Sequence, residues 1–91
     1  MRRYVIEREI PGVGGLKPEQ YKHVAVTSNE ALAKLAGKAQ WEQSFIVADK
    51  SFCIYLADSE AAVREHAQLS GFPANKVTEV RTVIGPMTGH A

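Results

Sequence analysis

The chain has one cysteine, almost no excess of charge of either sign and no long apolar run, and each shortage excludes a class of protein. A single thiol cannot form an intramolecular disulfide, so nothing points to an oxidising compartment. The net charge of +1 lacks the basic balance that is typical of nucleic-acid-binding proteins. The longest apolar runs, near 45–48 and 53–57, are far shorter than the roughly 18 residues of a membrane span. We therefore expect a cytoplasmic protein that binds neither nucleic acid nor membrane.

The amino-acid composition is that of one folded domain. Hydrophobic residues make up 45% and charged residues 23% of the 91 residues, which are the usual proportions in soluble domains. A chain of this length has room for a single domain, which the turn signals place at 1–86, followed by a short flexible tail at 87–91. Because so small a domain buries only about 60 to 65% of its unfolded surface, association into a homodimer would add stability.

Local patterns predict six elements of secondary structure. Clusters of β-branched and aromatic residues indicate strands, apolar spacings of three and four indicate helices, and Gly and Pro mark the turns. The predicted strands are 2–8, 40–48, 51–57 and 76–84, and the predicted helices are 17–36 and the run between Ser59 and Gly71. Because βαβ crossovers are right-handed, this β-α-β-β-α-β order predicts an α+β ferredoxin-like sandwich, an antiparallel sheet with both helices on one face. The other face is bare, and the first and third strands are neighbours in the middle of the sheet.

Alternation along the third strand predicts which of its side chains lie on the bare face. Phe52, Ile54 and Leu56 form a wholly apolar set, which should face the helices because apolar side chains are the ones a sheet buries. Cys53 and Tyr55 then point to the bare face.

The other strands add charged groups to this bare face. Burial of Tyr4 and Ile6 sends Glu7 to the bare side of the first strand. Glu79 and Arg81 should also point away from the helices, because charges are seldom buried unpaired. Trp41 would form an aromatic wall of the predicted pocket. The candidate pocket residues are Glu7, Trp41, Cys53, Tyr55, Glu79 and Arg81.

This face has two interpretations. Apolar surface around ion-paired groups fits a dimer interface, in which Cys53 is a small inert residue. A pocket that holds a thiol, a phenol and carboxylates would instead bind a metal, orient a polar ligand or transfer protons. No catalytic triad, phosphate-binding loop or paired-cysteine motif selects one chemistry, so no residue is assigned a catalytic role.

Two histidines are candidate metal ligands. His66 lies at the edge of the apolar stripe of the second helix, where it could form a surface metal site together with Glu65. The alternative is a partly buried imidazole that forms a hydrogen bond. His23 follows Glu19 by four residues on the solvent side of the first helix, which brings together two groups able to hold a divalent ion. A plain surface histidine is the alternative there. Scattered ligands of this kind favour surface sites completed by water or a neighbouring molecule over a closed zinc site.

Several segments of the sequence resemble a known family. They are RRYVIERE, NEALAKLA, FCIY, REHA, GFPA and TEVRTVI. From Arg3 to about Pro86 the chain resembles a family of small bacterial proteins of largely unassigned function that includes a dimeric nickel-binding protein. The resemblance implies a ferredoxin-like fold, a homodimer and binding of Ni(II) in sequestration or detoxification.

Few metal ligands carry over from this resemblance. The matching positions are Glu7, Arg8, Trp41, Phe52, Cys53, Tyr55, His66, Glu79 and Arg81, of which Glu7, Cys53, His66 and Glu79 are metal-ligand types. The strand alternation puts Cys53 on the bare face and His66 on the helix side, so we do not expect them to share an ion. The resemblance thus favours binding of a divalent transition metal, nickel first. The alternatives are a small-molecule or enzymatic pocket on the open sheet face and an interaction module that recruits another protein.

Overall fold

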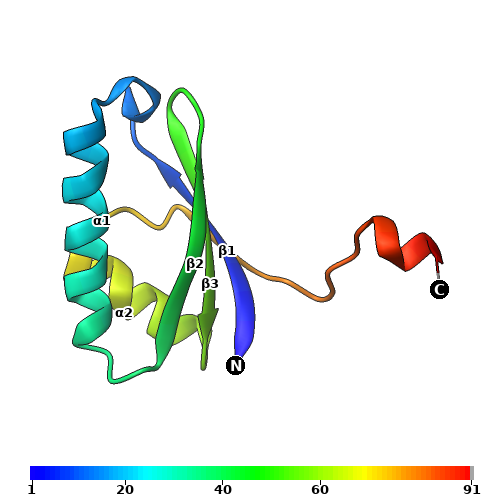
Figure 1. Cartoon of the computed structure of the whole chain (residues 1–91). Coiled ribbons are helices and arrows are strands. Elements are labelled where there is room, and N and C mark those ends of the chain that lie inside the picture. Colours follow the sequence, from blue (N-terminus) through cyan, green and yellow to red (C-terminus); the bar gives the residue numbers. More distant parts are fainter. Residues whose placement is uncertain (91) are drawn as a thin grey trace.

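The computed structural model describes residues 1–90, and within them the predicted order of strands and helices is confirmed. The elements are strands β1 (Arg2–Glu9), β2 (Ala39–Ile46), β3 (Lys50–Ala57) and β4 (Lys76–Glu79), helices α1 (Pro18–Ala33) and α2 (Glu60–Ser70), and 3₁₀ turns at Val13–Gly15 and Pro86–His90. The strands follow the order β2-β3-β1-β4, and every neighbouring pair is antiparallel. Figure 1 shows both helices on one face of this sheet, so the chain has the predicted α+β ferredoxin-like fold.

Local sequence determines where the helices begin and end. Pro18 occupies the first turn of α1, where a missing N–H leaves no hydrogen bond unmade. Ser59 caps α2, because its hydroxyl accepts a hydrogen bond from the backbone N–H of Ala62 at 3.3 Å. Gly71 ends α2 in the left-handed conformation, with φ of 81°. Within the described residues, neither the length nor the apolar character of any helix is sufficient to cross a membrane.

The first helix is shorter than predicted. It ends at Ala33, and tighter turns follow, in which the N–H of Leu35 donates to the carbonyl oxygen of Leu32 at 3.0 Å. The side chain of Leu35 is still buried in the core. The apolar spacing therefore continues past the end of the helix, which is why it predicted a helix as far as residue 36.

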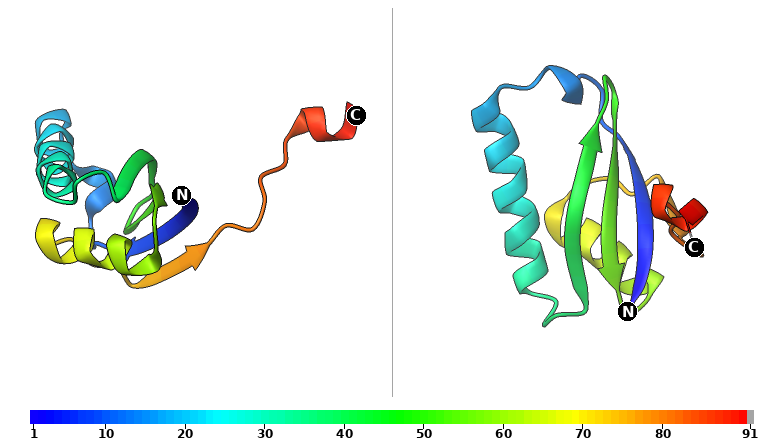
Figure 2. Two further views of the ribbon diagram at one scale, coloured as in Figure 1. Left: turned by 90° about the horizontal axis from the view of Figure 1, so that it is seen from below. Right: turned by 45° about the vertical axis from the view of Figure 1, so that its right-hand side comes forward.

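The last strand is also shorter than predicted, because its partner strand runs out. The N–H of Val80 donates to the carbonyl oxygen of Arg3 at 2.8 Å, and β1 starts at Arg2. Within residues 1–90 the next segment has no strand beside it, and Val83 and Ile84 are 66% and 76% exposed. Figures 1 and 2 show this segment leaving the sheet and ending in a short helical turn. That turn overlaps the predicted tail at 87–91, of which residue 91 lies outside the described residues.

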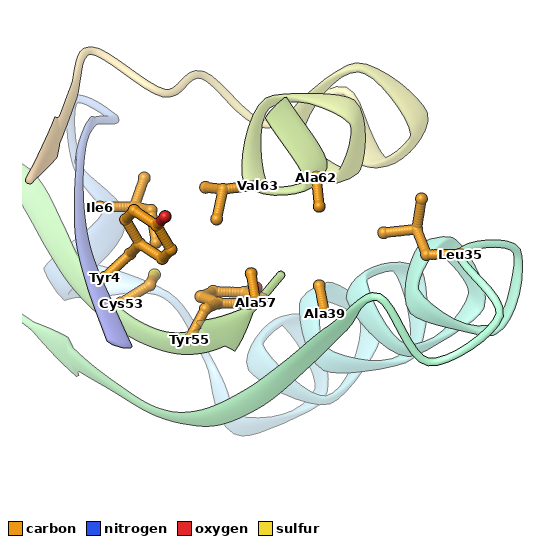
Figure 3. Close-up of a cluster of buried hydrophobic side chains, with 9 residues drawn as sticks. All are labelled: Tyr4, Ile6, Leu35, Ala39, Cys53, Tyr55, Ala57, Ala62 and Val63. Atoms are coloured by element: carbon orange, nitrogen blue, oxygen red, sulfur yellow. The ribbon is translucent and has the colours of Figure 1, made fainter. Parts of the chain in front are cut away.

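The core lies between the helices and the central strands, as Figure 3 shows. In β1, Tyr4 and Ile6 are buried, as predicted. They pair with Tyr55 and Cys53 of β3, and directly paired residues point to the same face of a sheet. The buried set of β3 is therefore Ser51, Cys53, Tyr55 and Ala57. The prediction that Cys53 and Tyr55 face away from the helices is wrong.

The error in β3 has a physical reason. The prediction gave the helix side to the more apolar set, but a buried tyrosine needs a partner for its hydroxyl. Tyr55 finds that partner on the helix side, where its hydroxyl lies 3.2 Å from the Ser28 hydroxyl of α1. Phe52, Ile54 and Leu56 remain half-buried on the bare face, which the helices of this chain do not cover.

Candidate functional site

A cavity of about 580 Å³ lies on the helix side of the sheet. One wall comes from α1 and the turn before it, including Val13, Leu16 and Val24, and the facing wall includes Trp41 and Ile46 of β2. Residues 71–73, which follow α2, close a third side. The lining is largely apolar, and the volume falls within the roughly 300 to 1,000 Å³ that is usual for small-molecule sites.

A glycine holds the loop before α1 against the β2–β3 hairpin at this cavity. The N–H of Gly14 donates to the carbonyl oxygen of Ala48 at 2.9 Å. A Cβ at this position would lie 2.5 Å from the carbonyl oxygen of Val47, which is closer than real contacts allow. The neighbouring N–H of Gly12 donates to the carboxylate of Asp49 at 2.8 Å. The glycine-rich loop therefore packs closely on the hairpin and positions Val13 in the cavity wall.

Three buried polar side chains connect both helices to the sheet beside the cavity. Ser28 of α1 places its hydroxyl 3.2 Å from the Tyr55 hydroxyl and 3.1 Å from Nε2 of His66 in α2. The rings of Tyr55 and His66 have their centres 4.9 Å apart. Ser28 and Tyr55 line the cavity, whereas His66 is fully buried and does not.

Among residues 1–90, Arg8 is the one charged residue that lines the cavity, and only 2% of it is exposed. Its Nη1 donates to the carbonyl oxygen of Pro73 at 2.7 Å, whereas its Nη2 has no hydrogen-bond partner among the described residues. The guanidinium carbon lies 6.0 Å from the ring centre of Tyr55 and 5.8 Å from that of Phe72. Within residues 1–90, none of the ion pairs includes Arg8. The cavity wall thus carries a buried cation without a carboxylate partner.

Two titratable groups near Arg8, His66 and Tyr55, are neutral at pH 7. Burial, together with the positive charge of Arg8, lowers the pKa of His66 to about 4. Burial also raises the pKa of the Tyr55 hydroxyl. At pH 7 the imidazole and the phenol are therefore uncharged, so neither compensates the charge of the guanidinium.

Three of the six predicted pocket residues line this cavity. They are Trp41, Cys53 and Tyr55, and all three lie on the helix side rather than on the predicted bare face. Cys53 is buried, with its sulfur 3.5 Å from the Ser51 hydroxyl. Cys53 and His66 were expected on opposite faces, but both belong to the helix side.

The other three predicted pocket residues lie apart from the cavity. Glu7 is on the bare face, where its carboxylate lies 3.9 Å from the ammonium of Lys50. Glu79 pairs in register with a buried residue of β1, so the prediction of the bare face is wrong for it too. Its carboxylate lies 3.5 Å from the guanidinium of Arg2 at the sheet edge. Arg81 follows β4 and is exposed.

The candidate metal ligands do not form a complete site within the described residues. His66 is fully buried and Glu65 is exposed, which contradicts a surface site made by this pair, because adjacent helix residues point apart. Glu19 and His23 are both exposed one turn apart on α1. In residues 1–90, no three His, Cys, Asp or Glu side chains gather in a group able to hold a metal. Metal binding by Glu19 and His23 stays a prediction.

The sequence argument did not place Arg8 and Ser28 in the cavity, although the pattern contains a signal for each. Arg8 continues the alternation of Tyr4 and Ile6, which places it on the buried side of β1. Ser28 lies within the apolar stripe of α1. A charged or polar residue in a buried register is the signal that could have identified both.

The fold and the cavity together define a small α+β sandwich with a largely apolar cavity that carries one buried cation. The model of the family described as nickel responsive protein SCO4226-like matches residues 4–80. The chain therefore belongs to this family, and the resemblance is confirmed. The crystal structure of SCO4226 from Streptomyces coelicolor A3(2) is similar in fold, with a TM-score of 0.73 at 16% identity. The alignment covers 90% of this chain and 99% of that chain. No curated protein matches this chain in sequence.

Proposed function

We propose that this protein binds a small, largely apolar molecule in the helix-side cavity. The observation that carries the proposal is the cavity itself, about 580 Å³ with apolar walls and a few polar groups. The cavity is partly open to solvent, and concave, largely apolar surfaces with a few polar groups are the usual form of small-molecule sites.

The test uses Trp41, because it is the single tryptophan of the chain and lines the cavity. A neutral apolar dye, N-phenyl-1-naphthylamine, should quench the emission of Trp41 as it enters. Ala25→Phe should weaken dye binding at least tenfold, since Ala25 lines the cavity from α1. Ala33→Phe is the matched control, because Ala33 is exposed at the end of the same helix. Equal dye affinity in the two variants would exclude the cavity as the binding site.

A second candidate function is Ni(II) binding, which the family description supports. Its cellular role would be sequestration or detoxification of the metal, with nickel as cargo. The exposed pair Glu19 and His23 supports a surface site, because a carboxylate and an imidazole one turn apart both suit divalent metals. Two ligands leave the remaining positions to water or to a second copy of the chain.

Native mass spectrometry of the metal-free protein titrated with Ni(II) tests this candidate. His23→Ala should abolish specific uptake of the metal, and His90→Ala should not, since His90 is an exposed residue far along the chain from α1. Unchanged uptake by His23→Ala would reject the site on α1.

We also infer that two copies of the chain associate through the bare sheet face. Val5, Phe52, Ile54 and Leu56 are half-buried on that face, and Phe45 beside them is 53% exposed. A contiguous apolar surface of this kind is typical of an interface rather than of a solvent-facing sheet. The cavity opens on the opposite side of the sheet, so dimerisation and ligand binding use separate surfaces.

A further inference from the structure

We propose that the molecule held in the cavity is an apolar monocarboxylate whose carboxylate pairs with Arg8. This inference rests on the proposed cavity-binding function and adds the chemical class of the ligand.

The charge of the cavity wall is the first argument. Arg8 is buried without a counter-ion in residues 1–90, and no Asp or Glu is among the residues that line the cavity. The titratable groups beside it, Tyr55 and His66, are neutral at pH 7. A buried charge is costly unless it is paired, so an anion in the cavity would relieve a cost that the chain alone leaves uncompensated.

The geometry of the guanidinium is the second argument. The hydrogen bond from Nη1 to Pro73 and the aromatic rings of Tyr55 and Phe72 restrain the side chain of Arg8. Its Nη2 still has donors that no atom of the described chain accepts. The planar fork of arginine matches the two oxygens of a carboxylate, and a restrained fork loses little entropy when it binds one.

The other residues that line the cavity indicate the chemical character of the ligand apart from its carboxylate. Trp41, Val24 and Leu16 offer apolar contact to a hydrocarbon or aromatic body. Arg8 is the single cation that residues 1–90 contribute to the lining, so the charge complement is a single acidic group rather than a polyphosphate. The neutral hydroxyls of Ser28 and Tyr55 add polar character without adding charge.

The test compares each acid with its neutral amide. The probes are 1-naphthylacetate against 1-naphthylacetamide and decanoate against decanamide, followed by Trp41 emission and by calorimetry at pH 7.4. At least one acid should bind tenfold or more tightly than its amide. Arg8→Met should weaken binding of that acid at least tenfold and leave the amide unchanged. Arg64→Met is the control, because Arg64 is an exposed residue of α2 that pairs with Glu60, and it should leave both affinities unchanged.

The outcomes separate this inference from the proposed function. Equal affinities for acid and amide, with binding lost in Ala25→Phe, would overturn the anionic ligand and leave the cavity-binding function standing. Failure of both pairs and of the neutral dye to bind would overturn the cavity-binding function and this inference with it. If Arg8→Met does not fold, as circular dichroism would show, the comparison of acid and amide in the unmodified protein decides alone.

Discussion

At the scale of single residues, the important feature is that ionisable groups are buried on the helix side of the sheet. Arg8 and His66 are both nearly inaccessible, and the positive charge of Arg8 contributes to the low pKa of His66. The two side chains therefore have different states at neutral pH, a cation and a neutral imidazole. The guanidinium of Arg8 places a positive charge in the cavity wall, whereas the imidazole of His66 lies 3.1 Å from the Ser28 hydroxyl and links α2 to α1.

The low pKa of His66 predicts a loss of stability in mild acid. The pKa of His66 is about 4 in the folded chain against 6.5 for a histidine exposed to water, so between these values the unfolded chain binds more protons. Stability is therefore complete above about pH 6.5 and falls as the pH drops toward 4. From the linkage relation we expect a loss of about 2 kcal/mol between pH 7.5 and pH 5 from this group. Urea denaturation at the two pH values measures it.

His66→Gln is the variant that isolates this effect. The glutamine amide can still bond to Ser28 but does not titrate, so its stability should depend less steeply on pH. His23→Gln, which alters an exposed histidine of α1, should keep the dependence of the unmodified protein. The same slope in both variants would show that another group causes the acid sensitivity.

At the scale of elements, most of the fold could be predicted because helix and strand signals are local. Pro18, Ser59 and Gly71 mark helix ends by their own backbone chemistry, and the structure has its helices where these residues indicated. The direction in which β3 turns its side chains is not local. It depends on the polar partner that α1 offers to Tyr55, and the helix packing that supplies this partner is not visible in the alternation of one strand.

The close contact between the glycine loop and the β2–β3 hairpin gives a prediction at this scale. Gly14→Ala would place a Cβ 2.5 Å from the carbonyl oxygen of Val47, so the loop or the hairpin must move. We expect a destabilisation of about 1 to 3 kcal/mol. Binding of the neutral dye should also weaken, because Val13 beside it forms part of the cavity wall. Urea denaturation and the Trp41 titration measure the two effects.

Gly15→Ala is a matched control one residue along the same loop. A Cβ at Gly15 would meet nothing within 4 Å, and the residue does not have a positive φ. We expect its stability and dye affinity to stay close to those of the unmodified protein. A loss as large as that of Gly14→Ala would mean that loop flexibility, rather than the close contact, sets the stability.

At the scale of the whole molecule, the two faces of the sheet differ in what they present. The helix face contains the cavity and its cation, and the bare face presents apolar side chains of β1, β2 and β3. Ile54 lies in a central strand of this bare face. Ile54→Asp should convert the proposed dimer into a monomer, because a carboxylate in an apolar interface would be buried without a partner. Light scattering coupled to size-exclusion chromatography measures the mass.

Val26→Asp is the control for this prediction. Val26 is an apolar residue of α1, 42% exposed and away from the sheet face, so its replacement should leave the mass unchanged. A monomeric mass for the unmodified protein at micromolar concentration would reject the sheet face as a self-association surface.

The amino-acid sequence alone was sufficient for the order of elements, the antiparallel sheet with two covering helices and the burial of Tyr4 and Ile6, because turn residues and apolar periodicity act over a few positions. The sequence also predicted three residues that line the cavity, Trp41, Cys53 and Tyr55, but it placed them on the wrong face of the sheet. Only the tertiary structure could decide which face of β3 meets the helices and that a cavity lies there. Both depend on contacts between α1, α2 and the sheet, where the gain from partnering a buried hydroxyl outweighs the preference for burying the most apolar set.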